Sequence, residues 1–203
     1  MERAARRQER TALFDTPAGY DDPLGMLLGC HRRIEKKIAT LNALYAHLSA
    51  KGIDAEAVRA AQGVLRYFDV AGAHHHADEE QDLFPMLRQR ITDASERERF
   101  ARLDAQLRDE HREIERVWLR LRKPLEALAD GLMRTIPETD VRAFATLYAR
   151  HIQTEESVFR SLTERWLGKS DLLALGRAMA ERRGAPFIGG QVQKPVRDEN
   201  WSG

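Results

Sequence analysis

The sequence predicts an all-α protein, an up-down-up-down four-helix bundle followed by a short extra helix and an extended C-terminal tail. In four long segments apolar residues recur every three or four positions, which is the spacing of one helix face, and no segment alternates like a strand. Each apolar stripe contains a histidine with a glutamate four residues later, in the pairs His31/Glu35, His75/Glu79, His111/Glu115 and His151/Glu155. Intervals of 44, 36 and 40 residues between these histidines suit antiparallel helices joined by short turns.

Composition excludes several classes of protein. Charged residues make up 32% of the 203 residues and nearly cancel, leaving a formal net charge of +1, so nothing indicates a nucleic-acid or membrane partner. No apolar run approaches the roughly 20 residues of a membrane span. The single cysteine, Cys30, rules out a disulfide within the chain and favours a reducing, cytoplasmic location. The sequence leaves open whether the chain has a protein partner.

The first two helices are bounded by turn and capping residues. Residues 1–20 carry arginines without periodicity and are interpreted as an N-terminal arm. The first helix is predicted to begin at Asp22-Pro23 and to stop at Lys51-Gly52. Asp54 is expected to cap the second helix, which extends to about residue 90 with a kink or break at Pro85.

The third and fourth helices complete a predicted bundle domain over residues 21–168. A capping box at Ser95–Glu98 is expected to open the third helix, which kinks or ends at Pro124 before Gly131 closes the segment. A second capping box, Thr135–Glu138, is expected to open the fourth helix, which stops at Gly168.

Residues 169–203 are predicted to form a short helix and an extended tail. Ser170 is expected to cap a helix that runs to about Arg183. The glycines and prolines that follow favour an extended tail, which is expected to lie over the bundle through Phe187, Ile188 and Trp201.

Three consecutive histidines in the second helix require a choice of register. At about 100° per residue, Val64, Phe68 and Met86 lie within about 40° of His75. Phe68 lies about 120° from His74 and about 80° from His76. We therefore expect His75 and Glu79 to face the core, with His74 and His76 flanking them in solvent, at the rim, or hydrogen-bonded to a ligand residue.

The repeated histidine predicts a buried dinuclear metal site. A single histidine on an apolar face is more often a hydrogen-bonded core residue, and a glutamate beside it is often an ion-pair partner of an arginine. Four histidines at the same stripe position on four successive helices favour a metal instead. Burying four imidazoles and two carboxylates without a cation would be costly, and a metal pair removes that cost.

Two segments resemble the hemerythrin-like family, also called HHE cation-binding domains. The first is His-His-Ala-Asp-Glu-Glu-Gln-Asp-Leu-Phe-Pro at 75–85, and the second is His-Ile-Gln-Thr-Glu-Glu-Ser-Val-Phe at 151–159, where Arg160 replaces a frequent proline. The resemblance covers about residues 22–167. It implies a non-haem di-iron site with an oxo or hydroxo bridge. The terminal ligands it implies are His31, His75, His111 and His151, and Glu79 and Glu155 bridge the irons.

The chain departs from oxygen-carrying hemerythrins, which use five histidines. No fifth histidine is evident on the first or third helix, where Leu27, Ile34, Leu107 and Ile114 are the neighbours. Glu35 and Glu115 are candidates for additional ligands, or for hydrogen-bond partners that orient the imidazoles. Mixed His/Glu ligands also suit manganese or zinc.

The predicted function is binding or sensing of a small ligand such as oxygen, nitric oxide or peroxide, or the holding of iron. One alternative is an enzyme, either a di-iron oxidase or peroxidase or an iron–sulfur cluster repair protein. The other alternative is a helical interaction protein with a structural metal. The sequence leaves open whether the protein is an enzyme.

Overall fold

The computed structural model describes residues 18–187, and this part of the chain consists of helices and turns without a strand. The predicted N-terminal arm therefore lies largely outside the described residues, as does the tail beyond Phe187, including Ile188 and Trp201. No helix among residues 18–187 combines the length and apolar character needed to cross a membrane. The helical elements are α2 (Pro23–Lys51), α3 (Ala55–Arg66), η1 (Tyr67–Gly72), α4 (Ala73–Ala77), η2 (Asp78–Leu83), α5 (Phe84–Arg90), α6 (Ala94–Ala129), α7 (Glu138–Trp166) and α8 (Lys169–Arg182).

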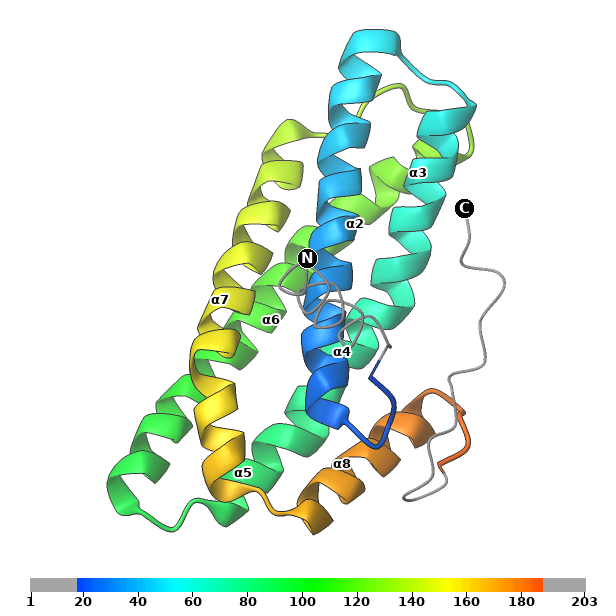
Figure 1. Ribbon diagram of the computed structural model, residues 1–203. Coiled ribbons are helices and arrows are strands. Elements are labelled where there is room, and N and C mark those ends of the chain that lie inside the picture. Colours follow the sequence, from blue (N-terminus) through cyan, green and yellow to red (C-terminus); the bar gives the residue numbers. More distant parts are fainter. Residues whose placement is uncertain (1–17, 188–203) are drawn as a thin grey trace, which may run out of the picture.

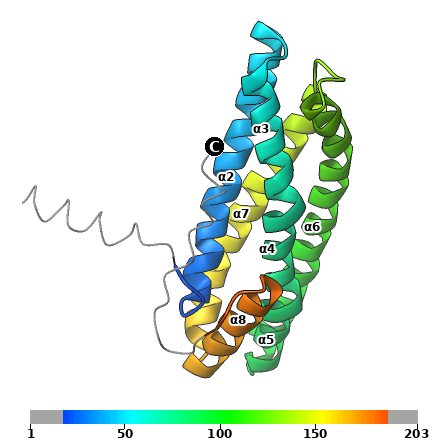
Figure 2. The same ribbon diagram turned by 90° about the vertical axis from the view of Figure 1, so that its right-hand side faces the viewer.

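The all-α class is confirmed, and the long helical segments lie side by side (Figures 1 and 2). The elements from α3 to α5 follow one another without a break and form one long helical segment over Ala55–Arg90. Contacts join α2 to α3 and α7, and join α6 to α3 and α7. The shorter α8 lies across one end and contacts α2 and η2 (Figure 2).

The residues predicted to bound α2 and α3 do so, and by the predicted interactions. The Asp22 carboxylate accepts a hydrogen bond from the Gly25 N–H at 3.0 Å, and Asp54 accepts one from the Ala57 N–H at 2.9 Å. These bonds satisfy N–H groups that the first helical turn leaves without partners. Gly52 ends α2 with a φ of 76°, a left-handed conformation that glycine adopts without steric cost.

The capping residues predicted for the later helices were wrong. Asp93, rather than Ser95, caps α6 by accepting from the Glu96 N–H at 2.8 Å. Pro137 precedes α7 and makes no side-chain capping bond. At α8 the Asp171 carboxylate accepts from the Gly168 N–H at 3.0 Å.

Pro124 does not end α6, which continues to Ala129 before Gly131 reverses the chain with a φ of 74°. Proline costs the helix one backbone hydrogen bond. Burial of Leu121, Leu125 and Leu128 along one face holds the helix together across this position. Tertiary packing therefore overrides the local signal.

The second helical segment does not break at Pro85 but contains two π-helical turns, η1 and η2. Proline lacks an N–H and its ring clashes with the carbonyl four residues earlier, which here belongs to Gln81 in η2. The wider π-helical turn, whose bonds reach from residue i to i+5, accommodates this. The irregularity predicted at Pro85 is therefore a change of helical register in the preceding turn.

Two apolar clusters fill the interior, with a polar layer between them. One cluster joins α2, α3, η1, α6 and α7 around Phe68 and Phe144. The other joins the start of α2, α5, the start of α6 and α8 around Phe84 and Phe100. Along α2, Leu27 belongs to the second cluster and Ile34 to the first, and His31 lies between them. The histidine stripe positions therefore meet in one buried layer.

The C-terminal helix α8 is attached at both ends by ion pairs. Near its start, Asp171 accepts from the Arg90 guanidinium at 2.7 and 3.0 Å. Near its end, Arg182 and Arg183 both pair with the fully buried Asp78 of η2. Phe187 lies under the Arg177 guanidinium, 5.6 Å from the ring centre.

We expect the apolar clusters to carry most of the stability. Leu41→Ala, at a fully buried position of α2, should reduce the free energy of unfolding by about 2–5 kcal/mol. Leu28→Ala on the same helix, at a position 41% exposed, should change it by less than about 0.5 kcal/mol. Denaturant titration of both variants measures the difference, and equal losses would contradict the assignment of the core.

Candidate metal centre

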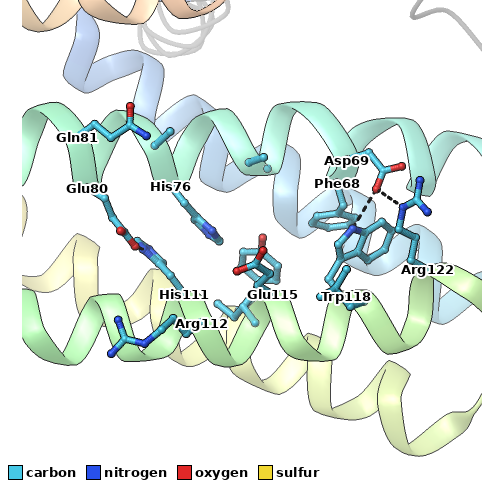
Figure 3. A pocket seen from close by; sticks show the side chains of 16 residues that line it. Phe68, Asp69, His76, Glu80, Gln81, His111, Arg112, Glu115, Trp118 and Arg122 are labelled. Carbon is cyan, nitrogen blue, oxygen red and sulfur yellow. Dashed lines mark hydrogen bonds and ion pairs between the residues drawn. The ribbon is translucent and has the colours of Figure 1, made fainter.

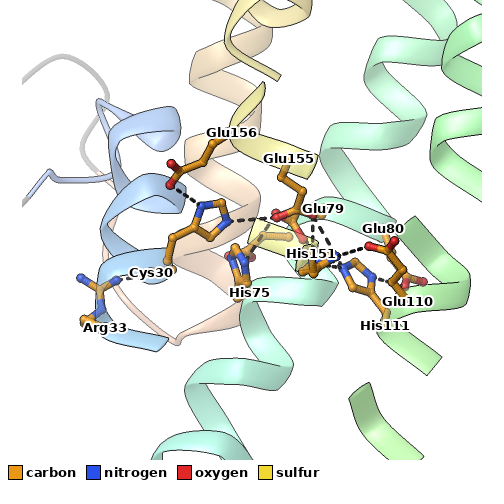
Figure 4. Close-up of polar contacts among 12 residues, drawn as sticks. Cys30, Arg33, His75, Glu79, Glu80, Glu110, His111, His151, Glu155 and Glu156 are labelled. Atoms are coloured by element: carbon orange, nitrogen blue, oxygen red, sulfur yellow. Dashed lines mark hydrogen bonds and ion pairs between the residues drawn. The ribbon is translucent and has the colours of Figure 1, made fainter. Parts of the chain in front are cut away.

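The six predicted ligand residues converge in the polar layer (Figure 4). None is more than 4% exposed. Candidate ligand atoms within 4.8 Å of one another form two groups that share both glutamates. The first group is His31, His75, Glu79 and Glu155, and the second is Glu79, His111, His151 and Glu155.

The two buried glutamates lie between the two groups of histidines. Glu155 places Oε2 3.0 Å from His31 Nε2 and Oε1 3.1 Å from His151 Nε2. Glu79 places Oε1 3.6 Å from His75 Nε2 and Oε2 3.4 Å from His111 Nε2. Each carboxylate thus directs one oxygen to each group, which is the arrangement that a bridging ligand requires.

Buried polar atoms without hydrogen bonds test whether these residues fit a metal. Among the described residues all such atoms belong to this layer: His31 Nε2, His75 Nδ1 and Nε2, His76 Nε2, and both carboxylate oxygens of Glu79 and of Glu155. The short nitrogen–oxygen distances above do not have hydrogen-bond geometry. Leaving so many buried polar atoms without partners is strongly unfavourable. Metal ions accept these imidazole nitrogens and carboxylate oxygens as ligands, so the donor set fits them.

Carboxylates from neighbouring helices hold the outward nitrogens of three histidines. The distance from Nδ1 to the nearest carboxylate oxygen is 3.0 Å between His31 and Glu156, 2.6 Å between His111 and Glu80, and 3.0 Å between His151 and Glu110. An ionised carboxylate only accepts hydrogen bonds, so each Nδ1 carries the proton and donates it. Once Nε2 has lost its proton, its lone pair is directed into the layer, which is the tautomer a metal ligand needs.

Sequence reasoning missed these three glutamates. Each lies next to a predicted ligand in the sequence, at Glu79-Glu80, Glu110-His111 and Glu155-Glu156. Adjacent residues on a helix point about 100° apart, so each glutamate contacts a histidine of a neighbouring helix instead. A glutamate directly beside a predicted ligand is the only signal in the sequence that points to them.

The two glutamates considered as extra ligands lie elsewhere. Glu35 and Glu115 are exposed, and neither belongs to a group whose atoms are placed to hold a metal. Glu115 lines a cavity beside the layer. The orienting role considered for them belongs to Glu80, Glu110 and Glu156.

His76 lies inside the layer, contrary to its predicted position at the flank. Its ring stacks on that of His111 with centroids 4.0 Å apart, and it forms a third candidate ligand group with His111 and His151. The second helical segment therefore places a fifth histidine in the layer, which the sequence did not predict. His74 remains partly exposed and belongs to none of these groups.

The π-helical turn η1 explains this difference. Each residue of a π-helix advances by less than the α-helical value of about 100°. The angle counted from Phe68 to His76 across Tyr67–Gly72 was therefore too large, and the true position of His76 is closer to the apolar face. Consequently His75 lies with His31 in the first group of ligand atoms, and His76 lies beside His111 and His151 of the second.

Charge interactions in the metal-free layer set the protonation of these groups. Burial disfavours the imidazolium of His31, but the nearby Glu155 carboxylate outweighs it and raises the pKa to about 9. In His111, Glu155, Glu79 and Glu80 together overcome burial and raise the pKa to about 11. Burial and the charge of Glu155 raise the pKa of Glu79 to about 7. Protons therefore occupy the metal-free layer at neutral pH, and a metal must displace them.

Comparison with known proteins agrees with this geometry. The chain is similar to an uncharacterized protein of Haemophilus influenzae, with 29% identity over 166 residues that cover 82% of this chain and 92% of that protein. Residues 22–162 match the hemerythrin HHE cation binding domain, and this match includes every histidine and glutamate of the layer. The chain therefore belongs to the hemerythrin HHE cation binding domain family, as its histidine and glutamate pattern predicted.

Proposed function

We propose that this chain is a non-haem di-iron protein that binds or senses a small ligand such as oxygen, nitric oxide or peroxide. The metal-binding unit spans residues 21–168, where four long helical segments form an up-down-up-down bundle around the metal pair. One observation supports the di-iron proposal above all. Among the described residues, the buried polar atoms without hydrogen bonds all lie in the layer of histidines and glutamates. A cytoplasmic location is part of the proposal, supported by the buried free thiol of Cys30.

The two groups of ligand atoms assign residues to two metal positions. His31 and His75 would hold one metal, His76, His111 and His151 would hold the other, and Glu79 and Glu155 would bridge them. Nitrogen and oxygen donors in this mixture suit iron, and manganese and zinc are the alternatives to be tested. Bound iron would supply a change of oxidation state and affinity for small diatomic ligands.

Other residues of the chain keep this site in place. Glu80, Glu110 and Glu156 hold the imidazole rings of three ligands through their Nδ1 protons. The apolar clusters cover the layer on two sides. His76 raises the number of histidines to five, which equals the number in oxygen-carrying hemerythrins. The departure from oxygen-carrying hemerythrins that was inferred from the sequence, which rested on a count of four histidines, therefore no longer holds.

The three consecutive histidines test the assignment of ligands. Purified protein should be yellow or brown and contain about two irons per chain. His75→Ala and His76→Ala should each reduce the iron content strongly, because each removes an imidazole whose Nε2 is buried without another partner. His74→Ala is the matched control and should retain the iron, since His74 lies outside the ligand groups.

Metal analysis of these variants with their visible spectra decides the outcome. Equal iron loss in all three variants would contradict the assignment. A colourless protein loaded with zinc would contradict the proposal of iron while leaving the ligand residues intact.

Metal binding should release protons near pH 8. The raised pKa values of His31 and His111, about 9 and about 11, keep both imidazoles protonated in the metal-free protein at this pH. Binding then displaces about two protons per chain, so the apparent affinity should rise with pH up to about 9, and less steeply from there to about 11, where His111 alone still carries a proton to be displaced. Calorimetry in two buffers with different ionisation enthalpies measures this number, and metal binding without proton release would contradict the protonation described here.

A further inference from the structure

A cavity of about 440 Å³ lies beside the metal centre, between the second helical segment and α6 (Figure 3). His76 and His111 lie at one end, Phe68 and Trp118 at the other, and Glu115 lies between them (Figure 3). We propose that this cavity binds a small aromatic amine in its cationic form, with the ring against the aromatic end and the ammonium group at Glu115.

The size of the cavity indicates an organic ligand. A water molecule occupies about 30 Å³ of liquid, and a diatomic gas needs little more. Pockets for organic molecules have volumes of about 300–1,000 Å³. The cavity is therefore larger than oxygen or nitric oxide requires, and its volume matches a molecule with one or two rings.

One end of the cavity is a rigid aromatic wall. The Phe68 ring lies 5.2 Å from that of Trp118 and 5.6 Å from that of Tyr148, measured between centroids. The Trp118 indole N–H donates to Asp69 at 3.1 Å, which fixes the orientation of the ring. Gly72 also lines the cavity. A Cβ atom added at this position would lie only 3.3 Å from Cδ1 of Phe68, so a larger residue would press on that ring. Aromatic faces of this kind bind flat rings and cations.

The charges around the cavity select a cation. Four charged residues that line it have partners of opposite charge: Asp69 pairs with Arg122, Arg122 also with Glu126, Arg112 with Asp109, and Glu80 with Arg108. The His111 imidazolium, which also lines the cavity, faces the carboxylates of Glu79, Glu80 and Glu155. Glu115 forms no ion pair within the described part of the chain. Its carboxylate therefore leaves one uncompensated negative charge beside an aromatic wall. A carboxylate next to an aromatic face is the combination that recognises an organic ammonium ion.

This inference goes beyond the proposed function, because the cavity and Glu115 exist without a metal. A ligand in the cavity would nevertheless contact His76 and His111, which are proposed ligands of the second metal. Organic ligand binding and the metal centre are therefore neighbours but are separable by experiment.

The test uses 2-phenylethylamine, which is an ammonium ion at neutral pH, and phenylacetate, an anion of similar size. Calorimetry with the metal-loaded full chain should show amine binding with a Kd of roughly 1 mM, as expected for about nine non-hydrogen atoms. Phenylacetate should bind more weakly by about tenfold or more, because it meets Glu115 with the same charge.

Three variants locate the site. Glu115→Gln should weaken amine binding about fivefold, the loss expected for one partly exposed charge pair. Glu113→Gln on the same helix is the matched control and should bind normally, since Glu113 pairs with Arg150 and does not line the cavity. Ala73→Phe places a ring in the cavity from an exposed position and should abolish binding.

Several results would overturn the proposal. These are no amine binding at millimolar concentrations, equal binding of amine and phenylacetate, or equal losses in Glu115→Gln and Glu113→Gln. Iron content is measured on the same samples. Absence of amine binding in the unsubstituted protein that holds its iron contradicts the cavity assignment alone, and amine binding by protein that takes up no metal contradicts the di-iron proposal alone.

Discussion

The structure depends on a buried layer of imidazoles and carboxylates between two apolar clusters. Neither Glu79 nor Glu155 is exposed, and none of their four oxygens has a hydrogen bond. Such groups are costly to bury unless positive charge compensates them. In the metal-free layer imidazolium protons supply part of that charge, as the raised pKa values of His31 and His111 indicate. A metal pair would supply more charge and would also give the unpaired atoms their ligand bonds.

The rest of the chain meets the geometric demands of this layer. The apolar clusters fix the helices above and below it, and carboxylates from neighbouring helices orient three of the imidazoles. The π-helical turns η1 and η2 change the register of the second helical segment, so that His75, His76 and Glu79 all reach the layer. Arg182 at the end of α8 and the adjacent Arg183 pair with Asp78, the residue directly before Glu79, and so hold this part of η2 from outside the layer.

Much of this was predictable from sequence because it depends on local periodicity. The apolar stripes located the helices, and the shared stripe position of four histidines predicted their convergence. The position of His76 was missed because it depends on the π-helical turn η1, and no residue pattern in the sequence predicts that turn. The contact between Glu156 and His31 was missed because it depends on how two helices pack, over a separation of 125 residues. The helix end predicted as one alternative at Pro124 was wrong for a related reason. The buried leucines around Pro124 stabilise the helix more than the proline destabilises it.

X-ray absorption at the iron edge of the purified protein tests the central claim most directly, because it reports the atoms around the metal. The account predicts nitrogen and oxygen neighbours, the scattering pattern of several imidazoles, and a second iron at about 3–4 Å. Imidazole scattering without a neighbouring iron would reduce the site to a single metal. Oxygen neighbours alone would place the iron outside the histidine layer and contradict the account.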